Sequence, residues 1–399
     1  MLIILILLFF LSGCWDSQEL SQRALVEGIG VDIEGDKFKV TCQIVPSEAA
    51  KAVLGGTTGG DPNLIWDITT KGKTVADALL ETKVITGRDP SFSHTRVLMF
   101  SKNAAERGIR EALDYFKRNE EIRRRAWIII ADDKIEDILK TQNKLNVIPS
   151  TGISVIMETS SAHTDVAAID LHCFSKKAAC SSSCAFAPLV SLRETIGRSD
   201  EEEVKSGSSK KDSGGYSEES SKLVDFHETA IFDDFKMIGV LNKKETRGLL
   251  LLQNRIKVTA VDIPSPRNPS LLLNVNVSTI KTSIKPQLNN GNLIIDIKVK
   301  SRGYINEKHD FNLDISKPEI MSKIGKQLDK TLKEELTMAL KKAQSVKADI
   351  FDFGDFIYKK HPKHWELIKD NWPQEFQNID FKIEVNSQIN WTGRIDNKD

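Results

Sequence analysis

Several features are scarce in this sequence of 399 residues, and each scarcity excludes a class of protein. Five cysteines in a chain of this length do not make a disulfide scaffold. Only 12 prolines and 23 glycines, beside 40% apolar residues, exclude a disordered or collagen-like chain. Lysine plus arginine and aspartate plus glutamate both number 56, so no overall positive field exists to attract nucleic acid. We therefore expect no nucleic-acid partner.

The opening apolar run is too short to cross a membrane, since residues 1–11 are apolar and a spanning helix needs about 20. Eleven residues is the length of a signal-peptide core. Leu11-Ser12-Gly13-Cys14 resembles the lipobox of bacterial lipoproteins, which implies lipidation of Cys14 and cleavage between Gly13 and Cys14. No Lys or Arg precedes the run, which leaves the true start of the chain open. The alternative is a cytosolic protein with a buried first strand.

The length predicts two or three domains. In the first half, strands alternate with helices, which predicts a mixed α/β (α+β) fold with mixed and antiparallel sheets flanked by helices. The expected strands are residues 24–32, 37–45, 64–69, 94–100 and 125–131. The expected helices are residues 73–85, 103–118 and 135–139, and residues 54–62 are expected to form a loop.

Residues 193–222 break this pattern, because they are almost all serine, glycine and charged residues. Such a segment cannot bury enough apolar surface to offset its ordering entropy. It is predicted to be a linker or mobile loop. The predicted divisions are a signal peptide over 1–13, an N-terminal part over 14–192 and a C-terminal α+β domain over 223–395.

The second half is expected to be rich in antiparallel strands. Residues 229–241 predict a hairpin turning at Asp233-Asp234, and residues 249–252 and 256–263 extend the sheet. Residues 271–284 and 293–299 predict a pair joined by Asn289-Asn290-Gly291. One long helix is expected over 316–346. Its apolar residues recur every four positions, so they wind around it; either several partners pack along it, or part of the stripe is free for another subunit.

The C-terminal segment is rich in aromatic residues. Gly354 is a candidate helix stop and Pro362 a candidate helix start. Trp365 and Trp372 have near-helical spacing, and residues 381–391 alternate as a half-buried strand. At these spacings the tryptophans are more typical of a core than of a ligand box.

Enzyme motifs fail on inspection. Gly28-Ile29-Gly30 lacks the third glycine of a dinucleotide loop, where Ile33 stands. Gly72-Lys73-Thr74 imitates the end of a phosphate-binding loop, but Asp67 occupies the place of its first glycine. No HExxH or GxSxG sequence occurs. We expect no enzyme, no catalytic residues, no cofactor and no metal.

Three other groups of side chains have alternative interpretations. His361 and His364 with Asp352 and Asp355 are weak metal-ligand candidates, because Pro362 separates the histidines. His172, Cys173, Cys180 and Cys184 match no common zinc spacing, and the cysteines are free thiols, a disulfide or metal ligands, in that order of preference. Arg123-Arg124-Arg125 lies at a strand entrance and is more typical of a solvated edge than of a phosphate clamp, with a surface facing anionic lipid headgroups as a further alternative.

Four stretches resemble the Ger(x)C family, the lipoprotein C subunits of spore germinant receptors. In order they contain Gly13-Cys14-Trp15-Asp16 with residues 28–32; residues 94–100 with Arg118, Glu121, Arg123 and Arg124; residues 230–250 with Lys236, Gly239 and Arg247; and Asp349, Phe353-Gly354, Pro362, Trp365, Trp372 and Phe376. Residues 159–184 depart from the family's usual text. The resemblance implies a non-enzymatic receptor subunit, lipid-anchored at the outer face of the spore inner membrane, with A- and B-type membrane subunits as partners.

Two rival functions remain open. A lipid-anchored extracytoplasmic solute-binding protein predicts a deep apolar cleft between the halves with convergent polar groups. An exported hydrolase predicts a nucleophile and a base brought together by the fold. The nutrient sensed, the stoichiometry and any contact with the nutrient are not encoded in a form that the sequence reveals.

Overall fold

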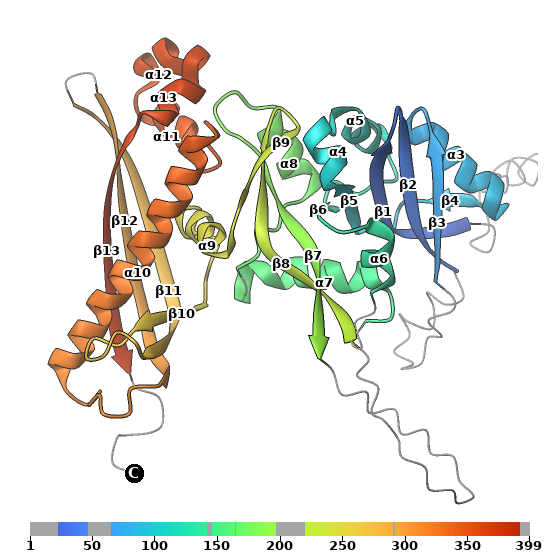
Figure 1. Cartoon of the computed structure of the whole chain (residues 1–399). Helices are drawn as coiled ribbons and strands as arrows, with labels where there is room; N and C mark the ends of the chain where they lie inside the picture. Colours follow the sequence, from blue (N-terminus) through green and yellow to red (C-terminus); the bar gives the residue numbers. More distant parts are fainter. Residues whose placement is uncertain are drawn as a thin grey trace, which may run out of the picture.

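The computed structural model describes residues 23–46, 65–141, 146–163, 165–196, 220–289 and 292–391. Figure 1 shows two sheets with their helices, one formed mainly by the N-terminal half and one by the C-terminal half. Within the described residues, no helix has the length and apolar character needed to cross a membrane.

The first sheet has nine strands in the order β3-β2-β1-β5-β6-β7-β8-β9, with β4 beside β1. Its strands are β1 Arg23–Glu34, β2 Lys37–Val45, β3 Trp66–Gly72, β4 Asp89–Ser91, β5 Val97–Ser101, β6 Trp127–Ala131, β7 Phe186–Ile196, β8 Ser220–Asp233 and β9 Lys236–Leu241. The pairs β1–β5, β5–β6 and β6–β7 are parallel, whereas both ends of the sheet are antiparallel. The predicted mixed sheet is confirmed.

Helices cover both faces of this sheet, which explains why the central strands are nearly continuous apolar runs. They are α3 Val75–Thr86, α4 Lys102–Arg107, α5 Arg110–Arg118, α6 Ile135–Lys140, α7 Pro149–His163 and α8 Leu171–Ala178. A Cβ on Gly30 would lie 2.2 Å from Ile135 Cγ2, and one on Gly28 would lie 2.8 Å from Ser150 Cβ. These two glycines therefore permit close helix packing.

The predicted linker over 193–222 is corrected at both of its ends. Residues 193–196 belong to β7 and residues 220–222 to β8, and the two stretches pair with each other. Residues 197–219 lie outside the described residues. Because β8 and β9 complete the first sheet, the boundary expected between 192 and 223 does not separate the two sheets. The pairing of distant strands that causes this is invisible to local composition.

The second sheet has the order β10-β11-β12-β13, with strands Thr259–Pro264, Leu272–Asn289, Asn292–Lys308 and Asp380–Trp391. The antiparallel pair β11–β12 is confirmed, and β13 returns parallel to β12. The remaining helices are α9 Lys243–Leu252, α10 Pro318–Ser345, α11 Phe353–Lys360, α12 Pro362–Ile368, η3 Lys369–Asn371 and α13 Trp372–Gln377. The mixed α/β (α+β) class with one long C-terminal helix is confirmed.

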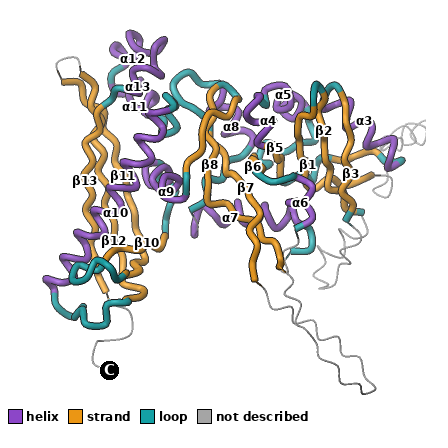
Figure 2. Tube along the Cα trace, in the orientation of Figure 1, coloured by secondary structure: helices purple, strands orange, loops and turns teal. Residues whose placement is uncertain are grey.

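The long helix α10 lies across the second sheet, and Figure 2 shows α9 between this sheet and the first one. The apolar stripe of α10, from Ile324 to Leu340, is buried, and α10 packs against α9, β10 and β13. The interpretation that different partners pack along the helix is therefore confirmed. The stripe is not free for another subunit.

Five local predictions are wrong. Residues 256–263 were expected to extend the sheet of the 229–241 hairpin, but the strand found there, β10, belongs to the second sheet. Residues 249–252 belong to helix α9 rather than to a strand. The helix expected over 103–118 is divided at Gly108, whose φ is 115°. The hairpin turns at Asp234-Phe235, where both residues have positive φ. Gly354 lies inside α11 rather than at a helix end. Glycine is needed there because a Cβ would be 2.4 Å from the carbonyl oxygen of Ser182. By contrast, the helix start at Pro362 and the buried positions of Trp365 and Trp372 are confirmed.

Candidate functional site

The predicted anchor residues, Gly13 and Cys14, lie outside the described residues, so lipidation and cleavage there stay predictions. The described chain begins at Arg23, whose guanidinium donates to Ser91 Oγ and to Glu121 Oε1, both at 3.3 Å. Glu121 also accepts the backbone N–H of Phe92 at 2.8 Å. The start of β1 is thereby fixed beside the loop that follows α5.

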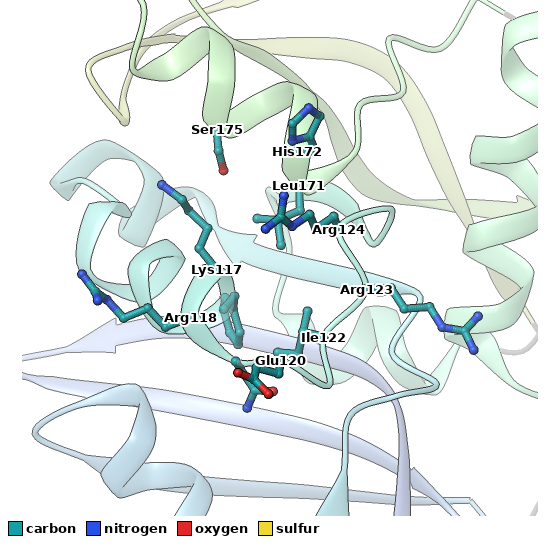
Figure 3. Close-up of a pocket in the computed structure, with 11 residues that line it drawn as sticks. Lys117, Arg118, Glu120, Ile122, Arg123, Arg124, Leu171, His172 and Ser175 are labelled. Carbon is teal, nitrogen blue, oxygen red and sulfur yellow. The ribbon is translucent and has the colours of Figure 1, made fainter.

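That loop forms one wall of a cavity of about 590 Å³, shown in Figure 3. The last turn of α5 supplies Lys117, the loop supplies Arg123 and Arg124, and α8 supplies His172 and Ser175. Phe116, Ile122 and Leu171 form the apolar part of the lining. This cavity is the basic pocket.

Backbone hydrogen bonds hold the two walls of the basic pocket together. The N–H of Leu171 donates to the carbonyl of Ala126 at 2.8 Å, and the N–H of His172 donates to the carbonyl of Arg124 at 3.0 Å. Asp170 caps α8 by accepting the N–H of Cys173 at 2.7 Å. The first turn of α8 is therefore fastened directly to the arginine-bearing loop.

Positive charge predominates around the basic pocket. In the described part of the chain, Lys117, Arg123 and Arg124 have no salt-bridge partner, whereas Arg118 donates to Asp114 Oδ2 at 2.7 Å. This arginine lowers the pKa of the Asp114 carboxyl through its hydrogen bond. Glu120 is the one acidic residue in the lining. Because the cationic residues in the lining outnumber the one acidic residue, the pocket carries a local positive charge in a neutral chain.

Ser175 is the buried polar group of the basic pocket, with 8% of its surface exposed. Among the described residues, its hydroxyl has no hydrogen-bond partner. In Figure 3 the Ser175 oxygen, the Lys117 amine and the Arg124 guanidinium point into the same space, while Arg118 and Arg123 point away from it. From the sequence, the arginine run and His172 were candidates for two unrelated sites. Sequence reasoning missed Lys117 and Ser175, whose polar type alone gives no signal of a shared cavity.

The cysteine group does not form a ligand set. Cys173 and Cys180 are exposed, Cys184 is half-buried, and all three are free thiols. Burial raises the pKa of the Cys184 thiol to about 12. Among the described residues, no cluster of three or more His, Cys, Asp or Glu side chains is arranged to hold a metal ion.

The other ligand candidates have structural partners. Asp352 forms an ion pair with Lys177 on α8, and Asp355 accepts the Ser182 hydroxyl at 2.6 Å, so the two carboxylates fasten the start of α11 to α8 and to the turn that follows it. The His361 ring lies 3.4 Å from the Pro286 carbonyl oxygen. Thr74 caps α3 by accepting the N–H of Asp77 at 3.1 Å, so its Gly-Lys-Thr context is a helix start.

A buried ionic network joins the two halves. Arg247 on α9 donates through Nε to Glu335 Oε2 on α10 at 2.7 Å, with a second, shorter bond from Nη2 to Oε1. Its Nη1 lies 3.3 Å from Asp165 Oδ2, which belongs to the N-terminal half. Burial lowers the pKa of Arg247, but the bonds and charge of Glu335 outweigh it and the net shift is upward.

Comparison with known proteins covers both halves of the chain. The model described as "Spore germination protein N-terminal domain" matches residues 16–192, and "Spore germination B3/GerAC like, C-terminal" matches residues 227–393. The chain belongs to the Ger(x)C family. The resemblance inferred from the four sequence stretches is confirmed.

Relatives and a solved structure agree with this assignment. The chain is 28% identical to spore germination protein KC of Bacillus subtilis (strain 168), over 99% of this chain and 96% of that protein. It is 23% identical to spore germination protein B3 of the same organism, over 96% and 95% respectively. The crystal structure of the GerBC protein has a TM-score of 0.56 at 18% identity, covering 94% of this chain and 99% of that one, which supports a shared fold.

Two of the stretches that resemble Ger(x)C proteins now have a structural explanation. Arg247 belongs to the ionic network between the halves. The buried Asp349 carboxylate accepts the N–H groups of Phe351 at 3.0 Å and Gly354 at 2.9 Å, and it fixes the turn that leads into α11. Burial raises the pKa of this carboxyl to about 7, against the opposing backbone hydrogen bonds. The stretch with Arg247 therefore links the two halves, and the stretch with Asp349 fixes the start of α11.

Proposed function

We propose that this chain is a lipid-anchored, non-enzymatic subunit of a nutrient germinant receptor that contributes to receptor assembly and signalling. Its relatives are spore germination proteins, and the family models cover both halves. The observation that carries the proposal is a cysteine that only Ser12 and Gly13 separate from an apolar run of eleven residues, in a chain of this family.

The anchor would place the folded part close to a membrane surface. Arg23 follows Cys14 by nine residues, and nine extended residues span at most about 30 Å. Two or three acyl chains hold a protein firmly to a bilayer. The proposed location is the outer face of the spore inner membrane, where tethering raises the effective concentration at A- and B-type membrane subunits.

A solute-binding role finds no support in the junction between the halves. The cavity there, about 740 Å³, is lined largely by charged and polar side chains, among them Asp165, Lys244, Arg247 and Lys330. The rival function requires an apolar cleft with a few polar groups.

The experiment is Cys14→Ala in spores, with Cys180→Ala as the matched control at an exposed free thiol. We expect Cys14→Ala to release the protein from the membrane fraction and to impair nutrient germination, because the acyl chains supply the membrane affinity. Cys180→Ala should change neither. Full membrane retention and normal germination of the Cys14→Ala spores would falsify the proposal.

A further inference from the structure

We propose that the basic pocket binds the phosphate group of a small anionic ligand, with Lys117, Arg124 and Ser175 as the groups that hold the phosphate. This proposal goes beyond the receptor function and rests on the pocket alone.

The donor set of the pocket suits an oxyanion. The Lys117 amine and the Arg124 guanidinium are unpaired within the described residues and point into the space that the Ser175 hydroxyl faces. Arginine presents a planar set of N–H donors and lysine a compact charge, and both bind phosphate oxygens well. The His172 ring, which lines the pocket, offers a further donor or acceptor nitrogen.

The buried hydroxyl is the second, independent observation. Ser175 is more than nine-tenths buried, and its Oγ has no partner in the described part of the chain. A buried hydroxyl without a partner is unfavourable, because it has lost its hydrogen bonds to water without replacing them. An acceptor oxygen in the pocket removes this cost, so the site favours a ligand that brings several acceptor oxygens.

The loop that follows α5 leaves the Arg124 guanidinium free to bind a ligand. Glu121 is the other acidic residue of this loop. Its carboxylate accepts hydrogen bonds from Arg23 and from the backbone N–H of Phe92, and it forms no ion pair with Arg124. The bond from the His172 N–H to the Arg124 carbonyl holds the arginine backbone against α8. The Arg124 backbone is thus fixed at the pocket, while its guanidinium has no ion-pair partner among the described residues.

The size and lining of the pocket select a small ligand. A cavity of about 590 Å³ is within the range of small-molecule sites, about 300–1,000 Å³. Phe116, Ile122 and Leu171 contribute apolar surface to the lining, which suits a ligand with an apolar part next to its phosphate. A soluble phosphate ester and an anionic lipid headgroup share this chemistry. The headgroup is within reach if the proposed anchor exists, because the loop adjoins Arg23.

The first test titrates the full-length chain, in micelles of a neutral detergent, with inorganic phosphate at constant ionic strength and follows binding by calorimetry. We expect saturable binding at one site. Lys117→Gln and Arg124→Gln should each weaken it about tenfold or more, and Ser175→Ala about threefold to tenfold, because charged hydrogen bonds contribute more than neutral ones. Arg123→Gln is the matched control: its side chain points away, so the affinity should change by about twofold at most.

The second test distinguishes the source of the phosphate. The chain is placed in bilayer discs of phosphatidylcholine, with or without phosphatidylglycerol, and the phosphate titration is repeated. A lipid source predicts that phosphatidylglycerol competes and lowers the apparent affinity for phosphate, and that Arg124→Gln removes this competition. A soluble source predicts the same affinity in both discs.

Two results would overturn the proposal. One is the absence of saturable phosphate binding in micelles. The other is equal weakening by Arg123→Gln and Arg124→Gln, which would indicate diffuse surface charge. Each variant is checked for an unchanged thermal unfolding temperature, so that a loss of binding is not a loss of fold. Because the micelle titration does not depend on Cys14, its outcome is independent of the lipid-anchor proposal.

Discussion

Replacing Arg247 with methionine removes a guanidinium that Glu335, Asp165 and the carbonyl of Ala260 all share. Methionine preserves most of the apolar stem, so the change isolates the charge and its hydrogen bonds. Glu335 would then be a carboxylate with 2% exposure and no cation beside it. Asp165 would keep its bond from the Thr259 hydroxyl, at 3.0 Å.

Breaking a buried ion pair by removing one partner costs about 3–5 kcal/mol, because it leaves an uncompensated buried charge. A domain is stable by only about 5–15 kcal/mol, so this is a large part of the total. Replacing both members with apolar residues is often neutral, since the desolvation cost of the pair disappears with it. The double variant Arg247→Met/Glu335→Leu should therefore recover most of the stability lost in Arg247→Met.

The assay is urea unfolding followed by tryptophan fluorescence at neutral pH, with the free energy of unfolding compared across the double-mutant cycle. Lys330→Met, an exposed cation on the same helix as Glu335, is the control and should stay within about 0.5 kcal/mol of the parent chain. A loss below about 1 kcal/mol for Arg247→Met, or no recovery in the double variant, would refute the reasoning.

Two further predictions concern the turn before α11. The folded chain holds the Asp349 proton up to about pH 7, while the unfolded chain releases it near pH 4, so the unfolding free energy should fall as pH rises between these values. Asp349→Asn should flatten this dependence of the urea midpoint on pH, and an unchanged slope would contradict the assignment. Gly354→Ala forces a Cβ against the Ser182 carbonyl and should cost about 1–3 kcal/mol, whereas Gly239→Ala meets only ordinary contacts; equal urea midpoints for the two would count against the close approach.

Elements whose pattern is local were predictable. The strand β2 was expected with its observed bounds, because alternation over 37–45 predicts a strand, although both of its faces are buried from Val40 to Val45. The β11–β12 pair and the long helix α10 followed from alternation and from a helical stripe beginning at a proline. In each case the residues that set the structure are neighbours in the sequence.

Helix α9 was misjudged although a local signal was present. Its four leucines are buried on all sides, and a short apolar run does not distinguish a buried helix from a strand. The decisive signal is the capping box: Asn242 accepts the N–H of Glu245 at 3.1 Å, and the Glu245 carboxylate accepts the N–H of Asn242 at 2.9 Å. Asparagine followed three residues later by glutamate was readable in the sequence.

The remaining differences have non-local causes. A glycine is needed at position 354 because Ser182, which is distant in the sequence, approaches its backbone. The basic pocket is built from α5 and α8, which β6 and α7 separate in sequence, so the arginine run alone gave no indication of an enclosed site. Only the fold brings Lys117 and Ser175 to the same cavity.

The boundary between the two family segments does not coincide with the boundary between the two sheets. One family model ends at residue 192 and the other begins at residue 227, yet β8 and β9 of the second segment complete the first sheet. Without β8, strand β7 would present an unpaired edge, and such edges favour association with other chains. The Arg247–Asp165 contact adds an ionic link across the same junction. Because β-pairing and a buried ionic network both cross the boundary, the two family segments are joined by strand pairing and by an ion pair as well as by the chain itself.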